Sequence, residues 1–427
     1  MNPERPPVPL PHPAGPLAGY RVLDLADEKG QLGARLLAEL GAEVIKVEPP
    51  REGDPARQRA PFYRNETGTE TSLYWWVMNA GKRSITLQLK LEQGRDLFHR
   101  LVAISDIVIE TTMPGEAAAL GLDYPSIERV NPSAILVSIT GFGQSGPYAR
   151  WHATDIVGAA MGGLMHLNGD PERGPVRTTV PQAYTQVNVQ AMVGALTALY
   201  ARAVNNGIGQ HVDVSMQEAV ANAMDNAQQT WDIRRVNTSG PGLYRNSAGV
   251  RAARYLFETA DGWVAALQAG GLIGLQANAI IDWLAEHGEA RGLDAPKWRQ
   301  KLTSLQPLTP EERQYVEETM AAFCRTRHKQ ELVAEAQRRG AGWAPVFSPR
   351  EIVESEQLAA RDYWARVHHE DIGESFTYPG APFRLSATPW KQRGRAPHLG
   401  EHNHEIYCGL LGLEPQDLRR LRLRMVI

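Results

Sequence analysis

The feature that most limits the fold of this chain is a β-α-β rhythm that begins close to its N-terminus. A short apolar run at residues 20–25 is followed by leucines at helical spacing and then by a second apolar run, Glu43–Glu48. Connections of this length favour parallel strands and right-handed crossovers. The rhythm continues with expected strands at 84–89, 106–111 and 134–143 and an expected helix at 92–102. The sequence therefore predicts an α/β fold, with a doubly wound, mainly parallel, Rossmann-like sheet that binds ligands outside the carboxyl ends of its strands.

The pattern changes along the chain, which predicts more than one domain. Residues 155–204 are mainly helical in pattern, and a further strand at 211–216 leads into another helix. The segment 254–268 has two β-rich arms around an Ala-Asp-Gly turn, which is typical of a hairpin, and three helical stretches follow it. Near the C-terminus, FTYPGAPFRLS suits edge strands and EPQDLRRLRLR suits a helix. We expect a proline-rich arm at 1–17, a large domain from 18–232 and 343–427, and a smaller α+β domain at 233–342.

Composition and charge exclude several classes of protein. The 427 residues are 43% hydrophobic and 22% charged, as in an ordinary globular protein with two or three domains. The net charge of -3 leaves no broad basic field, so nucleic acid is not an expected partner. Cys324 and Cys408 lack CxxC spacing, which argues against disulfides and a cysteine metal site and favours a cytoplasmic location. No apolar run reaches the roughly 20 residues that cross a bilayer, so no membrane partner is expected.

Several motifs could carry chemistry, and each also has a plainer reading. AGKRSITL places Lys82 and Arg83 directly before a strand, where two cations could hold phosphate oxygens, although the pair also fits a solvated turn. TGFGQSGPYA follows a strand and could bring backbone N–H groups to a ligand, but turn geometry alone also explains its glycines. His402 and His404 lack a third placed ligand, so no metal site is expected. The serine of GQSGP lacks the spacing of a hydrolase nucleophile.

The order of these segments is more specific than any one of them. The series LAGYRVLDL, GAEVIKVE, NAGKRSITL, DIVIE followed by Met-Pro-Gly, SITGFGQSGP, ATDIVGAAMGGL, GIGQHVDVSMQEA and APHLGEHN resembles the class III CoA-transferase family (CaiB/BaiF type), from about Leu17 to the C-terminus. The resemblance implies a large domain built from both ends of the chain, a smaller middle domain and a dimer of interlocked rings. It also implies coenzyme A or acyl-CoA as substrate, with no permanently bound cofactor.

The chain departs from this family at the catalytic position. The resemblance implies an aspartate at the entrance to the helix before GALTAL, which attacks the donor thioester and forms an anhydride. Counting back from Gly194 lands on Tyr184, or on Ala183 with a shift of one residue. A phenol with a pKa of about 10 is protonated at neutral pH and cannot form an anhydride. We therefore expect no catalytic residue of the family type.

The expected CoA-binding positions differ in part from the pattern of this family. After DIVIE the transferases often show Asn-Phe-Gly-Pro-Gly and then an arginine, whereas this chain has Thr111, Thr112 and, at the arginine position, Ala119. The first β-α loop reads ADEKGQLG and is one residue short. We expect CoA affinity to be reduced rather than lost. Lys82, Arg83, Asn79 and Arg51 match the family, and with Thr112, which stands in the departing segment, they are the expected CoA-binding residues.

Three hypotheses follow from the missing aspartate. In the first, the chain is similar to the aspartate-lacking subunit of heteromeric members such as succinyl-CoA:benzylsuccinate CoA-transferase, and its partner is a paralogous subunit that carries the aspartate. In the second, it is a self-sufficient acyl-CoA transferase, isomerase or lyase in which Tyr184 or another acid moves a proton. In the third, it is a non-catalytic CoA-binding scaffold, and Tyr184 simply packs at the helix entrance. The acids considered in the second hypothesis are Asp155, Asp170 and Glu172.

An aromatic segment lies close to the expected CoA-binding lysine. Tyr74, Trp75 and Trp76 precede AGKRSITL by a few residues. Such a cluster fits an aryl acid, and hence a role in aromatic-acid degradation, but buried packing is the commoner role of aromatic side chains.

Overall fold

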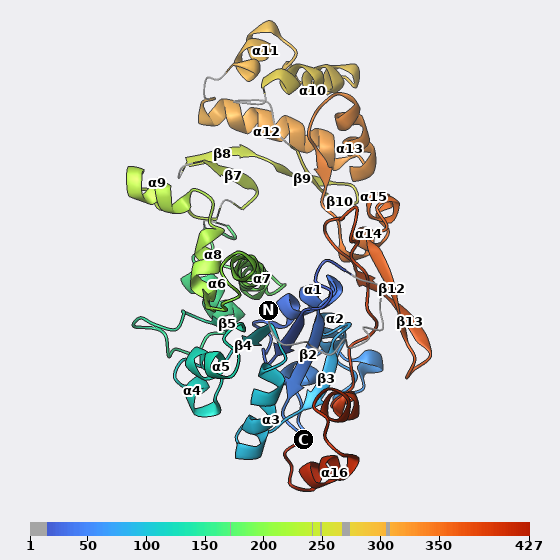
Figure 1. Ribbon diagram of the computed structural model, residues 1–427. Coiled ribbons are helices and arrows are strands. Elements are labelled where there is room, and N and C mark those ends of the chain that lie inside the picture. The colour runs from blue at the N-terminus through green and yellow to red at the C-terminus, as the bar shows by residue number, and fades with distance from the viewer. Residues whose placement is uncertain (1–14, 171, 241, 248–249, 267–273, 305–307) are drawn as a thin grey trace. The chain divides into compact units, whose positions relative to one another are not determined.

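The chain divides into two compact units that are not contiguous in sequence (Figure 1). The structure is a computed structural model that describes residues 15–170, 172–240, 242–247, 250–266, 274–304 and 308–427. Most of the expected proline-rich arm, residues 1–14, lies outside the described residues. The first unit comprises Met1–Gly163, Thr178–Ala223 and Gln357–Ile427, and the second comprises Leu164–Arg177 and Met224–Glu356.

The first unit is built on a six-stranded sheet in the order β3-β2-β1-β4-β5-β6, in which every neighbouring pair is parallel. The predicted α/β fold with a mainly parallel sheet is therefore confirmed. The strand order reverses between β1 and β4, so the carboxyl ends of those two strands form the switch point at which open α/β sheets bind ligands. The strands are β1 Arg21–Asp24, β2 Glu43–Glu48, β3 Arg83–Thr86, β4 Ile107–Glu110, β5 Ile135–Thr140 and β6 His211–Ser215.

Helices cover both faces of this sheet, which explains why β2, β4 and β5 are buried along their whole length. On one face, Leu23 and Val108 pack with Phe98 of α3 in a single buried cluster. On the other face, α1 and α7 pack together, and α7 also contacts β5 and β6. The helices of this unit are α1 Gln31–Glu39, α2 Leu73–Met78, α3 Glu92–Val102, α4 Glu116–Leu120, α5 Tyr124–Val130, α6 Asp155–Met161, α7 Gln182–Val204, α8 Met216–Asn222 and α16 Pro415–Leu423, with short 3-10 helices η1 Pro55–Gln58 and η2 Tyr63–Asn65 and the π-helical turn η3 Glu405–Leu410.

The C-terminal part of the chain completes the first unit. β12 Trp364–His369 pairs antiparallel with β13 Glu374–Pro379, which contains the FTYP segment expected to form an edge strand. The strand expected at 84–89 ends at Thr86 because the next residues pair elsewhere: the N–H of Gln88 donates to the carbonyl of Val426, 2.8 Å away. No described helix has the length and apolarity needed to span a membrane.

The second unit contains the expected hairpin and a layer of helices. β9 Leu256–Thr259 and β10 Gly262–Ala265 pair antiparallel, and β11 Ala344–Pro345 adds a third strand beside β10. Trp283, Phe323 and Trp343 pack at the centre of its core. Four helices, rather than the three expected, follow the hairpin before β11 within the described residues. The remaining elements are β7 Tyr244–Ser247, β8 Val250–Arg254, α9 Ala227–Arg234, α10 Gly274–Glu286, α11 Pro296–Thr303, α12 Pro310–Arg325, α13 Lys329–Arg338 and α14 Pro349–Val353, with α15 Glu356–Ala360 at the unit boundary.

The second unit extends further than the expected small domain at 233–342. It continues to Glu356 because β11 pairs with β10 and because Lys329 forms an ion pair with Glu351 of α14 at 2.6 Å. It also includes Leu164–Arg177, where the carbonyl of His166 accepts a hydrogen bond from the N–H of Gly240 at 3.0 Å. The helical pattern expected over 155–204 is accordingly broken between α6 and α7.

Candidate functional site

The switch point of the sheet is closed by the loop between β1 and α1. The N–H of Leu25 donates to the carbonyl of Ile109 at 2.8 Å, and the N–H of Asp27 donates to Oγ1 of Thr111 at 3.0 Å. The loop that follows β1 is therefore fixed to the residues that follow β4. This places the acidic loop ADEKGQLG at the ligand-binding edge of the sheet.

The first turns of α7 are attached to the same edge through Asn188. Its buried side chain accepts a hydrogen bond from the N–H of Gly33 at 2.6 Å and donates to the carbonyl of Lys29 at 2.8 Å. The same amide also donates to the carbonyl of Tyr184 at 2.7 Å. Because one side chain binds the loop, α1 and the start of α7, these three segments form one rigid arrangement.

Tyr184 is the third residue of α7 and lies among carboxylates. Its N–H donates to Oδ1 of the buried Asp155, the first residue of α6, at 3.1 Å. Burial, together with the negative charges of Glu28 and Asp27, raises the pKa of Tyr184 to about 12. The phenol is therefore protonated at neutral pH, and this helix entrance presents a weak acid rather than an anion.

Glu28 and Arg59 are charged groups of this site that the sequence patterns do not reveal. They form an ion pair between the first loop and the residue that follows η1. Burial raises the pKa of Glu28, while the charge of Arg59 opposes that rise. The guanidinium of Arg59 also lies over the ring of Tyr74, 4.1 Å from its centroid. In the sequence, Glu28 is marked only by its place in the short acidic loop. Its ion-pair partner, Arg59, lies 31 residues away, so the pair is not visible in a local pattern.

Lys82 and Asn79 are buried, and their side chains bond to protein atoms rather than facing solvent. The ammonium of Lys82 donates to Oδ2 of Asp24 at 2.7 Å, to Oδ1 of Asn79 at 2.8 Å and to the carbonyl of Gln31 at 2.9 Å. Its side chain is fully buried, and burial lowers its pKa to about 8. The predicted contact of Lys82 with a CoA phosphate stays a prediction, and it would require the ammonium to leave three protein acceptors.

Arg83 lies at the opposite end of the sheet from the switch point. It is the first residue of β3, and its guanidinium pairs with Glu43 at 2.6 Å and Glu405 at 3.1 Å. Together with Arg393 and His402 it lines a pocket of about 240 Å³ beside the amino ends of β2 and β3. Lys82 also lines this pocket, but its ammonium is bonded to Asp24, whereas the guanidinium of Arg83 is bonded to Glu43 and Glu405.

Arg51 and Thr112 are the expected CoA-binding residues that lie at the carboxyl edge. Arg51 is exposed just beyond β2 and has a left-handed backbone, with φ of 70°. Thr112 follows β4, and both its N–H, at 2.7 Å, and its hydroxyl donate to the carboxylate of Glu110. Ala119 lies in α4, where it supplies no charge. The edge thus carries one exposed cation from the expected set.

The glycine-rich loop after β5 is held mainly by protein partners. The N–H of Gly143 donates to Oγ1 of Thr140 at 2.8 Å, and the N–H of Gln144 donates to the carboxylate of Asp213 at 2.9 Å. Gly143 has φ of 84°, a conformation that favours glycine. Turn geometry therefore accounts for this glycine, and two of the loop's N–H groups are already bonded.

The other acids and aromatic groups separate in space. Asp155 lies in the first unit beside Tyr184, whereas Asp170 and Glu172 belong to the second unit. Trp75 is buried, and the guanidinium of Arg57 lies 3.8 Å from the centroid of its ring. Among the described residues, no group of three His, Cys, Asp or Glu side chains could hold a metal ion.

Known proteins of similar sequence and structure cover almost the whole chain. Residues 17–403 match the profile of a family described as CoA-transferase family III. The subunit BbsE of succinyl-CoA:(R)-benzylsuccinate CoA-transferase from Thauera aromatica is 34% identical over 413 residues, which cover 94% of this chain and 96% of BbsE. Succinyl-CoA–D-citramalate CoA-transferase from Chloroflexus aurantiacus is 33% identical over 424 residues, which cover 97% and 99% of the two chains. The crystal structure of a CAIB/BAIF family protein from Brucella suis superposes with a TM-score of 0.80 at 27% identity, over 93% of this chain and 100% of that one.

Proposed function

The chain belongs to CoA-transferase family III, and from this premise we propose that it is the aspartate-lacking subunit of a heteromeric enzyme that moves CoA between carboxylic acids. The observation that carries the proposal is Tyr184 in the first turn of α7, where the family's transferases are expected to hold an aspartate. A phenol with a pKa of about 12 holds its proton at neutral pH and forms no acyl anhydride. In this proposal the partner subunit supplies the carboxylate nucleophile.

The exposed side of α7 supports a partner subunit. The inner side of this helix is buried, with Val187 and Ala191 both 0% exposed. The outer side is also apolar: Val193 is 56%, Tyr200 is 71% and Val204 is 59% exposed. A helix that is hydrophobic all round is normally buried, and a contiguous exposed apolar face marks an interaction site. We propose that a paralogous subunit carrying the aspartate covers this face, in the interlocked arrangement implied by the resemblance.

The carboxyl edge of the sheet supports acyl-CoA as the ligand of the first unit. Arg51 offers an exposed cation there, beside Thr112, whose own N–H and hydroxyl are bonded to Glu110. The proposed acids include aromatic ones, because BbsE belongs to an enzyme named for (R)-benzylsuccinate. In this proposal Lys82, with Asn79 beside it, holds Asp24 at the end of β1. Arg83 holds Glu43 at the amino end of β2.

The proposal is tested by purifying the chain alone and together with the product of a neighbouring paralogous gene. We expect a stable heteromer, CoA transfer only by the pair, and a covalent CoA adduct on the partner alone by intact-protein mass spectrometry. A panel of aryl and aliphatic acids then identifies the acceptor. A homodimer that transfers CoA and carries the adduct itself would refute the proposal.

The proposed contact through α7 has its own test. Val193→Glu with Tyr200→Glu places two charges on the outer face of the helix, so we expect association to weaken by a factor on the order of 100. Leu423→Glu is the matched control, because Leu423 is an apolar residue of the same unit that is 85% exposed but lies on α16. Equal association of both variants with the partner would place the contact elsewhere.

A second candidate is a self-sufficient acyl-CoA enzyme. It is favoured by Asp155, which binds the N–H of Tyr184, and by Glu28, whose raised pKa would suit proton transfer. In this candidate the isolated homodimer turns over acyl-CoA, and Tyr184→Phe or Glu28→Gln abolishes the turnover. Turnover that survives both substitutions would exclude these two groups.

A further inference from the structure

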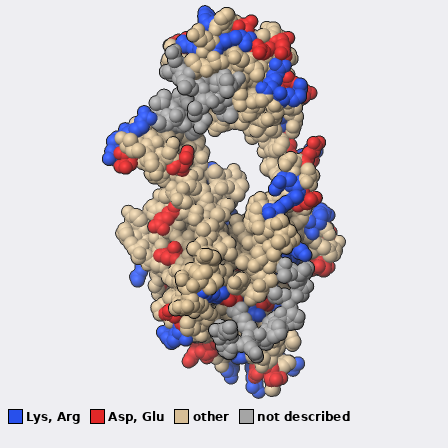
Figure 2. Space-filling model, turned by 45° about the horizontal axis from the view of Figure 1, so that its top comes forward, with Lys and Arg blue, Asp and Glu red and all other residues tan. Residues whose placement is uncertain are grey.

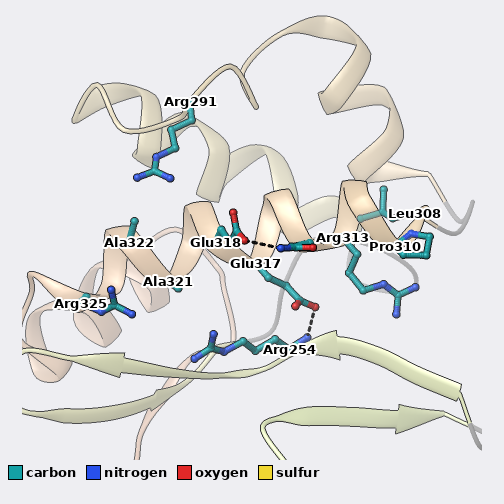
Figure 3. A pocket seen from close by; sticks show the side chains of 11 residues that line it. Arg254, Arg291, Leu308, Pro310, Arg313, Glu317, Glu318, Ala321, Ala322 and Arg325 are labelled. Carbon is teal, nitrogen blue, oxygen red and sulfur yellow. Dashed lines mark hydrogen bonds between the residues drawn. The ribbon is translucent and has the colours of Figure 1, made fainter.

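The second unit contains a groove along one side of α12 that the proposed CoA chemistry does not use. Its volume is about 930 Å³, and its charged lining residues are Arg254, Arg291, Arg313, Glu317, Glu318 and Arg325 (Figure 3). All of the lining residues belong to the second unit, so the groove is independent of the switch point in the first unit.

The length of the groove follows from the spacing of residues on α12. Arg313, Glu317, Ala321 and Arg325 recur every fourth residue, so they lie along one side of the helix. Twelve residues separate the two arginines, which is about 18 Å at 1.5 Å per residue. Arg254 lies near the Arg325 end, whereas Arg313 lies beyond Glu317 (Figure 3). The groove therefore carries positive charge at both ends.

Two of the arginines are positioned by the protein around them. Nε of Arg254 donates to the carbonyl of Leu256 at 2.8 Å, and its guanidinium lies 5.0 Å from the centroid of the Phe257 ring. Arg291 is exposed, and its carbonyl accepts a hydrogen bond from the hydroxyl of Tyr315, which fixes its backbone beside α12. These contacts orient the side chain of Arg254 and fix the backbone of Arg291. The terminal N–H groups of Arg254 remain available to a ligand.

The acidic groups of the groove do not cancel its positive charge. Glu317 is 6% exposed and accepts the backbone N–H of Arg254 at 3.0 Å, and Glu318 accepts a hydrogen bond from Gln314 at 2.8 Å. Four arginines and two glutamates leave a net charge of 4 − 2 = +2 on the lining. On the face drawn in Figure 2, basic and acidic side chains are interspersed over the second unit, so the excess of positive charge is local.

Arg325 is an arginine of the groove that is open to solvent. Its side chain is 67% exposed, and its salt bridge, to the 56% exposed Glu258, is long at 3.9 Å. A pair of this kind contributes little to folding stability. Arg325 can therefore turn toward a stronger anion at little cost.

We propose that this groove binds an organic polyphosphate of nucleotide size. Guanidinium groups bind phosphate through paired hydrogen bonds. The phosphates would bind to Arg254, Arg291 and Arg325, and Arg313 would add positive charge further along α12. Ala321 and Ala322 leave room for a flat base between the ends, and Glu318 can accept hydrogen bonds from ribose hydroxyls. A small dicarboxylate has no base or ribose to fill the middle of the groove, so it would leave most of the volume to water.

The proposal is tested by calorimetric titration of the intact chain at low salt with adenosine 3′,5′-bisphosphate, inorganic pyrophosphate and succinate. We expect the bisphosphate to bind more tightly than pyrophosphate and succinate to bind least. In Arg291→Gln with Arg325→Gln, the loss of two guanidiniums should weaken the bisphosphate site by about 100-fold, roughly tenfold for each. The control pair, Arg338→Gln with Arg350→Gln, removes two exposed arginines of the same unit that do not line the groove, and should bind like the unchanged chain.

The binding constants of the two variant pairs support or refute a polyphosphate site in the groove. If the groove pair binds the bisphosphate like the control pair, or if succinate binds more tightly than the bisphosphate, the proposal is wrong. Arg313→Gln provides a second variant, and equal thermal midpoints show that weakened binding does not reflect unfolding. Any nucleotide site in the first unit persists in both pairs, so the expected result is the loss of one binding event. Because no transfer assay enters the test, its result is independent of the proposed CoA-transferase function.

Discussion

The entrance to α7 in the first unit and the groove along α12 in the second unit both gather charged side chains, but they use them differently. Beneath the α7 entrance, the ammonium of Lys82 makes three hydrogen bonds to protein atoms and is fully buried. Along the groove, Arg325 is 67% exposed, and its salt bridge to Glu258 is long at 3.9 Å. Charges whose partners are internal hold a fold together, whereas charges that face solvent remain available to a ligand.

The largest expected change in stability comes from a substitution of Lys82, whose hydrogen-bond partners are buried in the first unit. Lys82→Met leaves Asp24 buried without its nearest cation, so we expect a loss of about 3–5 kcal/mol in the free energy of unfolding, measured by urea denaturation. Lys90→Met is the matched control, because Lys90 is exposed at the start of the loop before α3. A loss no larger than that of the control would show that the buried cluster does not hold the first unit together.

The next effect separates the two glutamates of the groove. Glu317 is buried and binds the backbone N–H of Arg254, so Glu317→Ala should cost about 1–3 kcal/mol in the free energy of unfolding. The adjacent Glu318 is exposed, and Glu318→Ala should change that free energy by less than about 0.5 kcal/mol. Equal losses in urea denaturation would contradict the view that only one of them has an internal role.

A spectroscopic titration tests how closed the α7 entrance is. The folded-state pKa of Tyr184 is raised to about 12, so its protonated form favours folding. That contribution is fully present below the unfolded pKa of about 10 and is lost as the pH rises from about 10 to about 12. The difference in tyrosinate absorbance between the unchanged chain and Tyr184→Phe should therefore have its midpoint near 12. A midpoint near 10 would indicate a phenol in free contact with water.

The smallest expected change in stability comes from a substitution in the solvent-exposed groove along α12. Arg325→Gln removes an exposed cation with one weak partner, so we expect the free energy of unfolding to change by less than about 0.5 kcal/mol. The same substitution should nonetheless weaken binding of adenosine 3′,5′-bisphosphate. A large loss of stability would mean that Arg325 has a structural role.

Much of the first unit could be predicted because its signals are local. The apolar run of β2 Glu43–Glu48 and the helical spacing of α3 Glu92–Val102 have the boundaries that the sequence predicts. The switch point follows from strand order, which short connections and right-handed crossovers restrict. Periodicity and connection length are properties of residues that are close in sequence. They therefore predict the structural features that depend on contacts between such residues.

The direction of individual charged side chains could not be predicted in the same way. Lys82 and Arg83 are adjacent, yet one reaches Asp24 inside the unit and the other reaches Glu43 at the amino end of the sheet. Glu28 finds its partner Arg59 only after the loop and η1 have been brought together. Each pairing depends on contacts between distant segments, which a local charge pattern does not encode.

The outer face of α7 has a consequence for the cell as well as for the enzyme. If the proposed subunit arrangement holds, a chain synthesised without its partner subunit exposes the hydrophobic outer face of α7, which includes Val193 and Tyr200. Such unpaired chains would aggregate, or would be bound by chaperones and degraded by proteases. Balanced synthesis of the two gene products would then be a condition for either one to persist.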